Sequence, residues 1–178
     1  MSLYVETTIE IDATARRVWS VLMDFEAYPE WNPFVRGIQG SAMAGQRLRV
    51  SICPPSGRSM RFRPQLLTVN RERELRWRGS LVVPGLFDGE HCFKLEPISA
   101  SRTRFTQGES FSGLLVALFE NRLQGPTRQG FEQMNLALKL RTESLGPDER
   151  VKGCRRENPS LTVAGTATAW DSRALPHP

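Results

Sequence analysis

Glu90-His-Cys-Phe-Lys-Leu-Glu96 and Thr103-Arg-Phe-Thr-Gln-Gly-Glu-Ser-Phe111 alternate apolar and polar side chains on either side of a short polar turn. Alternation with a period of two is typical of half-buried β-strands, and the turn between them predicts an antiparallel hairpin. Phe105 and Phe111 share one face of the second segment, so we expect that face to point into the core. Gln107 and Glu109 lie on the same face and are therefore predicted to be polar side chains directed inward.

Further alternating segments precede this hairpin. Residues 4–11 are predicted to form a strand that ends at Asp12, which we expect to cap a helix over residues 13–24. After this helix we predict six strands, which include the two strands of the hairpin; the other four lie at 35–41, 46–53, 58–69 and 74–83. Short strands joined by tight turns indicate an antiparallel meander.

From about residue 113 to residue 145 the apolar period becomes helical. One face carries residues that step by four, four, three and four positions: Leu123, Thr127, Phe131, Met134 and Leu138. Gly125-Pro126 lies inside this segment and predicts either a kink or two abutting helices. A long helix needs a partner for its apolar face, and a twisted antiparallel sheet offers a concave one. We therefore predict an α+β fold in which a curved antiparallel sheet wraps around a long C-terminal helix and encloses a cavity.

The composition is that of a globular domain followed by a tail. The chain has 178 residues, of which 39% are hydrophobic and 24% are charged. We predict one domain over residues 1–146 and a disordered tail over 147–178, where no hydrophobic period continues. No apolar run approaches the roughly 18 residues that cross a bilayer, and the N-terminus lacks the pattern of a cleaved signal. We therefore expect a cytoplasmic location.

Cysteine and histidine are too sparse for a metal site. The three cysteines and two histidines are scattered without the spacing of metal ligands. The sequence also lacks a glycine-rich phosphate loop and the motif of a serine nucleophile elbow. We predict reduced thiols, no metal and no cofactor.

Several short motifs resemble those of a known superfamily. Residues 24–34 read Asp-Phe-Glu-Ala-Tyr-Pro-Glu-Trp-Asn-Pro-Phe, and weaker matches lie at 11–13, 18–19, 77–79, 89–93 and 109–113. Over about residues 3–145 the chain resembles the START-like (SRPBCC) superfamily, within it the polyketide cyclase/dehydrase and lipid-transport-like branch. The resemblance implies a helix-grip fold with a ligand cavity. It leaves open whether a member binds lipids, sterols, polyketides or hormones, acts as a cyclase or aromatase, or assists other proteins.

The hairpin is predicted to bring two polar pairs together on the concave face. If the turn is centred on Ala100, His91 lies opposite Glu109 and Phe93 lies opposite Gln107. Opposed residues have Cβ atoms about 4.5–5.5 Å apart, so an imidazole and a carboxylate can bond there.

The strand before the hairpin adds an indole to this wall. A turn centred on Gly85 would place Trp77 next to Phe93 and Gly79 next to His91. We therefore expect a carboxylate, an imidazole, an amide and an indole on one concave surface.

This cluster leads to a first hypothesis, that the protein binds a small hydrophobic or amphipathic molecule, lipid-like or polyketide-like, between the sheet and the C-terminal helix. His91 and Glu109 would fix the polar group of the ligand. The sheet would contribute six wall residues, the helix two, and one more would lie near the mouth. These predicted ligand-binding residues are Trp77, His91, Phe93, Gln107, Glu109 and Phe111 on the sheet, Phe131 and Met134 on the helix, and Trp31 at the mouth.

Three alternatives remain open at this point. His91 and Glu109 are candidates for a catalytic acid/base pair in an enzyme of the cyclase/dehydrase type. The same pair would also serve as a satisfied internal contact that stiffens the sheet. A chaperone-like interaction module is the third, and an exposed apolar patch would be its sign.

Arginine dominates the positive charge, with 24 Lys and Arg residues against 19 Asp and Glu and a net charge of +5. Six arginines are predicted to lie on the outer side of three consecutive strands: Arg47, Arg49, Arg61, Arg63, Arg76 and Arg78. Few aromatic residues lie among them for base stacking, so we expect a solvated face and no nucleic-acid partner. A weak attraction to anionic membrane surfaces is compatible with this stripe. The sequence does not indicate the oligomeric state.

Overall fold

The computed structural model describes residues 2–55, 58–80 and 84–144, so the predicted tail at 147–178 lies outside the described residues. The helices and strands follow one another along the chain as β1 (Ser2–Ile11), α1 (Ala15–Met23), the 3-10 helix η1 (Phe25–Ala27), α2 (Tyr28–Trp31), β2 (Val35–Gln39), β3 (Arg49–Ile52), β4 (Met60–Phe62), β5 (Gln65–Asn70), β6 (Glu74–Ser80), β7 (Asp88–Ser99), β8 (Arg102–Ser112) and α3 (Val116–Ser144). This is the predicted order of elements, with one strand more than expected.

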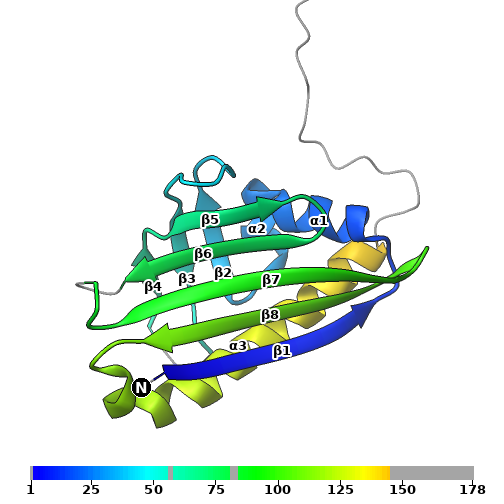
Figure 1. Cartoon of the computed structure of the whole chain (residues 1–178). Helices are drawn as coiled ribbons and strands as arrows, with labels where there is room; N and C mark the ends of the chain where they lie inside the picture. Colours follow the sequence, from blue (N-terminus) through cyan, green and yellow to red (C-terminus); the bar gives the residue numbers. More distant parts are fainter. Residues whose placement is uncertain (1, 56–57, 81–83, 145–178) are drawn as a thin grey trace, which may run out of the picture.

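The strands form two antiparallel sheets. A five-stranded sheet has the order β1-β8-β7-β6-β5, and a three-stranded sheet has the order β2-β3-β4. In Figure 1 the long helix α3 runs behind β8 and β1, and the three-stranded sheet lies behind β5 and β6. The large sheet thus curves around the helix, and the predicted α+β fold is confirmed.

The chain passes from one sheet to the other at Pro64. We expected a single strand over residues 58–69, but the structure contains β4 and β5 with Pro64 between them. Proline has no backbone N–H, so a ladder of hydrogen bonds cannot run through this position unbroken. An isolated bridge between Arg47 and Gln65 is formed where the two sheets meet.

The N-terminal helix begins two residues later than expected. Thr14, and not Asp12, is the N-cap of α1, and its hydroxyl accepts a hydrogen bond from the Arg17 amide at 3.2 Å. Asp12 instead accepts a hydrogen bond from Arg102 Nε at 2.7 Å, which ties β1 to the start of β8.

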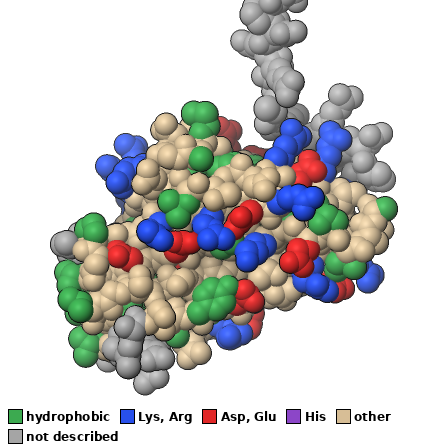
Figure 2. Space-filling model, viewed as in Figure 1, with side chains coloured by type: hydrophobic (Ala, Val, Ile, Leu, Met, Phe, Trp, Pro, Cys, Tyr) green, Lys and Arg blue, Asp and Glu red, His purple; other side chains and the backbone are tan. Residues whose placement is uncertain are grey.

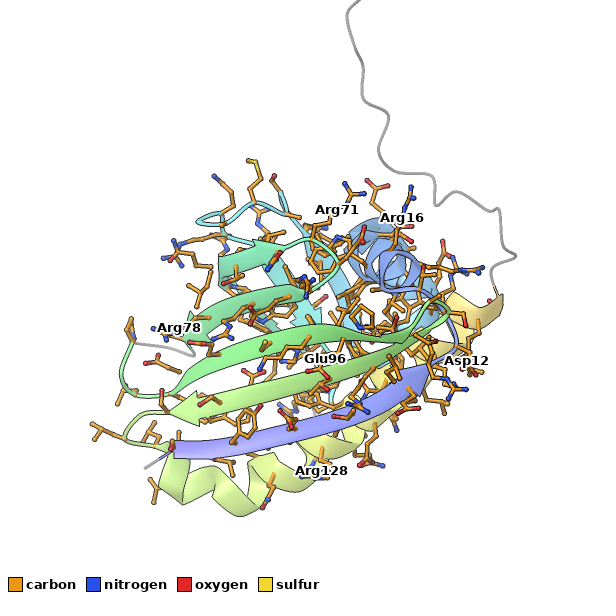
Figure 3. All side chains as sticks on the ribbon, turned by 45° about the vertical axis from the view of Figure 1, so that its right-hand side comes forward. Asp12, Arg16, Arg71, Arg78, Glu96 and Arg128 are labelled. Carbon is orange, nitrogen blue, oxygen red and sulfur yellow. The ribbon has the colours of Figure 1, made fainter. Side chains whose placement is uncertain are left out.

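Helix α3 is packed along β1 and is continuous through Pro126. Arg128, labelled in Figure 3, donates from Nη1 to the Glu6 carbonyl oxygen at 3.3 Å, and Lys139 donates to the Glu10 carbonyl oxygen at 2.8 Å. Of the two arrangements expected around Gly125-Pro126, two abutting helices are therefore not found. No helix in the described ranges is both long enough and apolar enough to cross a membrane.

Candidate functional site

A cavity of about 360 Å³ lies between the two sheets and α3. The five-stranded sheet contributes side chains that include Trp77, His91, Glu109 and Phe111. Apolar groups form most of this wall. His91 adds an imidazole to it, and Glu109 adds a carboxylate. Such a surface, apolar with a few converging polar groups, is typical of sites for small molecules.

His91 and Glu109 form a direct pair on this wall. They are opposite each other in the ladder between β7 and β8, as the turn at Ala100 predicted. His91 Nδ1 lies 2.6 Å from Glu109 Oε2, and the side chains of His91 and Glu109 are 4% and 19% exposed. The carboxylate is therefore the more accessible partner, and it fixes the orientation of the imidazole ring.

Aromatic rings surround the His91 imidazole. Trp77 stacks on it with ring centroids 5.2 Å apart, and Phe93 and Phe131 contact it edge to face at 4.4 and 5.1 Å. His91 Nε2 is buried and has no hydrogen-bond partner among the described residues. A buried polar nitrogen without a partner is uncommon, and sites that bind ligands are one place where it occurs.

Gln107 has a different role from the one expected. It lies opposite Phe93 as predicted, but it does not line the cavity. Gln107 Nε2 donates to the Phe131 carbonyl oxygen at 2.9 Å and to Asn135 Oδ1 at 2.5 Å, and Asn135 donates to Thr7 Oγ1 at 3.0 Å. This buried network joins α3 to β1 and β8 behind the cavity.

Of the nine predicted ligand-binding residues, five line the cavity and four do not. Trp77, His91, Glu109, Phe111 and Phe131 line the cavity. Phe93, Gln107 and Met134 are buried behind this wall. Trp31 is half-buried in α2 and packs against Tyr28, with ring centroids 5.0 Å apart, so it is not among the lining residues.

The predicted register between β6 and β7 was wrong by two residues. Trp77 pairs with His91, and Gly79 pairs with Gly89. The expected neighbours Trp77 and Phe93 still touch, because their rings meet edge to face with centroids 5.2 Å apart. The centre of the long connection after β6 could not be located from turn residues alone.

Most of the cavity wall comes from residues outside the predicted ligand-binding set. The three-stranded sheet provides Val35, Ile52, Met60 and Phe62, and Phe34 comes from the segment before it. The four residues of this sheet could not be recognised because the prediction contained only one sheet. On the helix, Leu123 and Thr127 also line the cavity; both belong to the predicted apolar stripe, which was the available signal.

Cys92 lies between His91 and Phe93 in β7 and therefore points to the outer face of the sheet. Its Sγ donates to Glu74 Oε1 at 3.2 Å. Burial and this contact with Glu74 raise the pKa of the Cys92 thiol to about 11, which keeps it protonated at neutral pH. Burial opposes ionisation of Glu74, but hydrogen bonds from Arg76 and Cys92 outweigh it and lower the pKa of Glu74. The described residues contain no cluster of three His, Cys, Asp or Glu side chains that would hold a metal ion.

Known structures share this architecture. The Zhui aromatase/cyclase from Streptomyces sp. R1128 superposes with a TM-score of 0.68 at 17% identity, over 80% of this chain and 94% of that chain. A START superfamily protein from Mycobacterium smegmatis gives 0.62 at 23% identity, over 79% and 97%. A norcoclaurine synthase from Thalictrum flavum, in complex with a transition-state analogue, gives 0.61 at 13% identity, over 81% and 98%. At these identities the likeness bears on the fold alone, which is of the helix-grip type.

The sequence itself identifies the family. No curated protein matches the chain. Residues 2–143 match the family described as polyketide cyclase/dehydrase and lipid transport, which is most of the chain. This protein therefore belongs to the polyketide cyclase/dehydrase and lipid-transport family.

Proposed function

We propose that the protein binds one small hydrophobic or amphipathic molecule, lipid-like or polyketide-like, in the cavity between the sheets and α3. The observation that carries the proposal is the combination of an apolar cavity of about 360 Å³ with a carboxylate–imidazole pair on its wall. A volume of this size lies within the range of about 300–1,000 Å³ typical of small-molecule sites. The hydrocarbon part of the ligand would contact Trp77, Phe111 and Phe131. Its polar group would meet Glu109.

Native mass spectrometry of freshly purified protein is the first test. A stoichiometric adduct, extracted and identified, would name the chemical class of the ligand. Binding of a fluorescent fatty acid then locates the site through a pair of helix variants. Thr127→Phe fills the cavity from α3, whereas Gln129→Phe adds the same ring on an exposed position of the same helix. We expect only Thr127→Phe to abolish binding of the fluorescent fatty acid. Equal binding by both variants would contradict the proposal.

An enzyme of the cyclase/dehydrase type is the second candidate, and the geometry of the pair favours it specifically. Glu109 is partly exposed at the cavity and hydrogen-bonds His91 Nδ1, so a proton can be exchanged at the carboxylate while the imidazole orients it. The chemistry would be proton transfer next to a carbonyl group of a bound ketone.

A ketone probe tests this candidate without knowledge of the natural substrate. Deuterium exchange next to the carbonyl of 2-tetralone in D₂O, followed by NMR, should proceed faster with the protein than in buffer. Glu109→Gln should abolish this acceleration while the fatty-acid probe still binds. Equal loss of probe binding and exchange would indicate that the pair only recognises the ligand.

A further inference from the structure

The arginines on the outer face of the five-stranded sheet are neutralised by carboxylates. Arg76 contacts Glu74 and also Glu90, the latter at 3.1 Å, and Arg78 contacts Glu90 at 2.5 Å. Figure 2 shows the result as basic and acidic side chains that alternate across this face. A partner of either charge would find little net potential there.

The chain around the three-stranded sheet has the opposite character. Residues 31–71 contain no Asp, Glu or Lys, but they contain seven arginines: Arg36, Arg47, Arg49, Arg58, Arg61, Arg63 and Arg71. Arg71 pairs with Glu72 at 3.3 Å. The other six form no ion pair with an acidic side chain in the part of the chain that the structure describes. The predicted stripe of six outward arginines is therefore divided between the two sheets. Its members on the five-stranded sheet are paired with carboxylates, and its members around the three-stranded sheet are not paired with one in the described part of the chain.

Three of these arginines share a hollow on the side of the three-stranded sheet that faces away from the cavity. Arg49, Arg61 and Arg63 line a depression of about 1020 Å³, in which Glu26 is the one acidic lining residue. The strand register places Ser51 beside Arg61 on this face, whereas Ile52 and Met60 line the cavity on the other. The sheet is thus a thin wall with an apolar side and a basic side.

Two exposed apolar side chains lie on segments that are hydrogen-bonded to each other near Arg47. Met43 is 58% exposed and Leu67 is 40% exposed. The loop that carries Met43 is attached to β5, because the Gly45 amide donates to the Leu66 carbonyl oxygen at 2.7 Å. At the same junction, Arg47 Nη1 lies 3.5 Å from the Arg63 carbonyl oxygen. Basic groups interspersed with exposed apolar side chains are typical of surfaces that lie on anionic lipid.

We propose that the arginine face, defined by Arg47, Arg49, Arg61 and Arg63, docks on anionic lipid bilayers, with Met43 and Leu67 entering the headgroup region. Nucleic acid fits this face less well, because the aromatic residues that border the hollow, Phe25 and Phe62, are half-buried and not presented for stacking. Docking does not depend on what occupies the cavity. It would bring the cavity wall formed by Met60 and Phe62 close to the lipid.

Vesicle flotation of the full chain tests the proposal. The probes are vesicles of pure phosphatidylcholine and of phosphatidylcholine mixed with phosphatidylglycerol. We expect binding to the mixed vesicles only, and we expect added salt to release the protein because the charges are screened. Replacing Arg49, Arg61 and Arg63 together by glutamine should weaken binding by roughly 100-fold, since each basic residue at such a surface contributes about fivefold.

The matched control removes the same charge from ion-paired positions. Arg71, Arg102 and Arg104 each contact a carboxylate and are replaced together by glutamine. We expect this triple variant to bind mixed vesicles within about fivefold of the unaltered protein. Equal losses in the two triple variants would overturn the proposal, because net charge alone would then explain binding.

Two further results would overturn it. One is equal binding to neutral and anionic vesicles, and the other is a single-stranded oligonucleotide that displaces the protein from mixed vesicles and binds it more tightly. Circular dichroism and fatty-acid probe binding are measured on the same variants. If the variant without Arg49, Arg61 and Arg63 is folded and still binds the fatty-acid probe but no longer binds vesicles, docking is a function separate from ligand binding.

Discussion

The carboxylate of Glu109 occupies the space directly over Gly89, where a side chain on β7 would otherwise stand. A Cβ built on Gly89 would overlap Glu109 Oε1. Gly89 and Glu109 both line the cavity, so the missing side chain is what allows the carboxylate to lie flat against the sheet and reach His91 at 2.6 Å. The position of the polar pair therefore depends on a residue that has no polar group.

Gly89→Ala should displace Glu109 and separate it from His91. The imidazole would then keep a buried nitrogen without its acceptor, which costs about 1–3 kcal/mol of unfolding free energy. Urea unfolding measures this loss, and long-range ¹H–¹⁵N NMR of the imidazole reports the change at Nδ1. Gly79→Ala is the control, because its new Cβ would meet the Phe62 side chain at 3.2 Å and would not touch the pair. Similar effects of both variants would contradict this account of Gly89.

The loss of stability on replacing Glu109, the acceptor of this hydrogen bond, should depend on the side chain that takes its place. Glu109→Leu leaves the buried His91 Nδ1 without a partner and should lower the unfolding free energy by about 1–3 kcal/mol. Glu109→Gln retains an oxygen at the same distance and should cost about 1 kcal/mol or less. Urea unfolding of the two variants tests the order. A Leu variant as stable as the unaltered protein would show that the pair contributes nothing to stability.

The contributions of Gln107 and Asn135 to stability should be coupled, because both belong to the hydrogen-bond network behind the cavity. Gln107→Leu leaves Asn135 Oδ1 buried without its donor, and we expect a loss of about 1–3 kcal/mol. Replacing Asn135 by leucine in the same protein removes the orphaned acceptor, so the double variant should lose less than the sum of the single variants. Unfolding free energies of the four proteins give the coupling. Strict additivity would indicate that the two side chains act separately.

Cys92 should react slowly with alkylating agents until the solution is strongly alkaline. Burial and Glu74 raise the pKa of this thiol to about 11, and the thiolate is the reactive form, so reactivity appears only as the pH rises toward that value. Iodoacetamide labelling with peptide mass spectrometry over a range of pH measures it, with unfolded protein as the reference. Glu74→Gln should shift the profile to lower pH, though only in part because burial is the larger cause. A labelling rate equal to that of unfolded protein at pH 8 would contradict this prediction.

Local patterns were enough to predict the large sheet and the helix behind it. The alternation in residues 90–96 and 103–111 and the short turn between them determine both the strand faces and the pairing of His91 with Glu109. A short hairpin leaves few registers, and a slip by one residue would turn the apolar side chains of one strand to the outer face. Longer connections carry less information, which is why the register between β6 and β7 was misplaced by two residues.

Most of the cavity wall could not be predicted, because its composition depends on where the chain changes sheets. Pro64 interrupts the expected strand over residues 58–69, and β4 then belongs to a second sheet whose Met60 and Phe62 close the cavity. Alternation shows which residues share a face, but not what that face meets across the interior. Gln107 illustrates the same limit, since its inward direction was predictable and its bond to the Phe131 carbonyl oxygen was not.

Different stretches of the chain determine the polar groups of the cavity and its volume. The polar pair is carried by β7 and β8, whereas much of the surrounding volume is shaped by β2, β3 and β4, which meet the larger sheet at the bridge between Arg47 and Gln65. Substitutions or loop exchanges between residues 35 and 62 can therefore enlarge or narrow the cavity while the chemistry at its wall is retained. Under the proposed function, variants of this protein could differ in the size of the ligand they bind while they retain the carboxylate–imidazole pair.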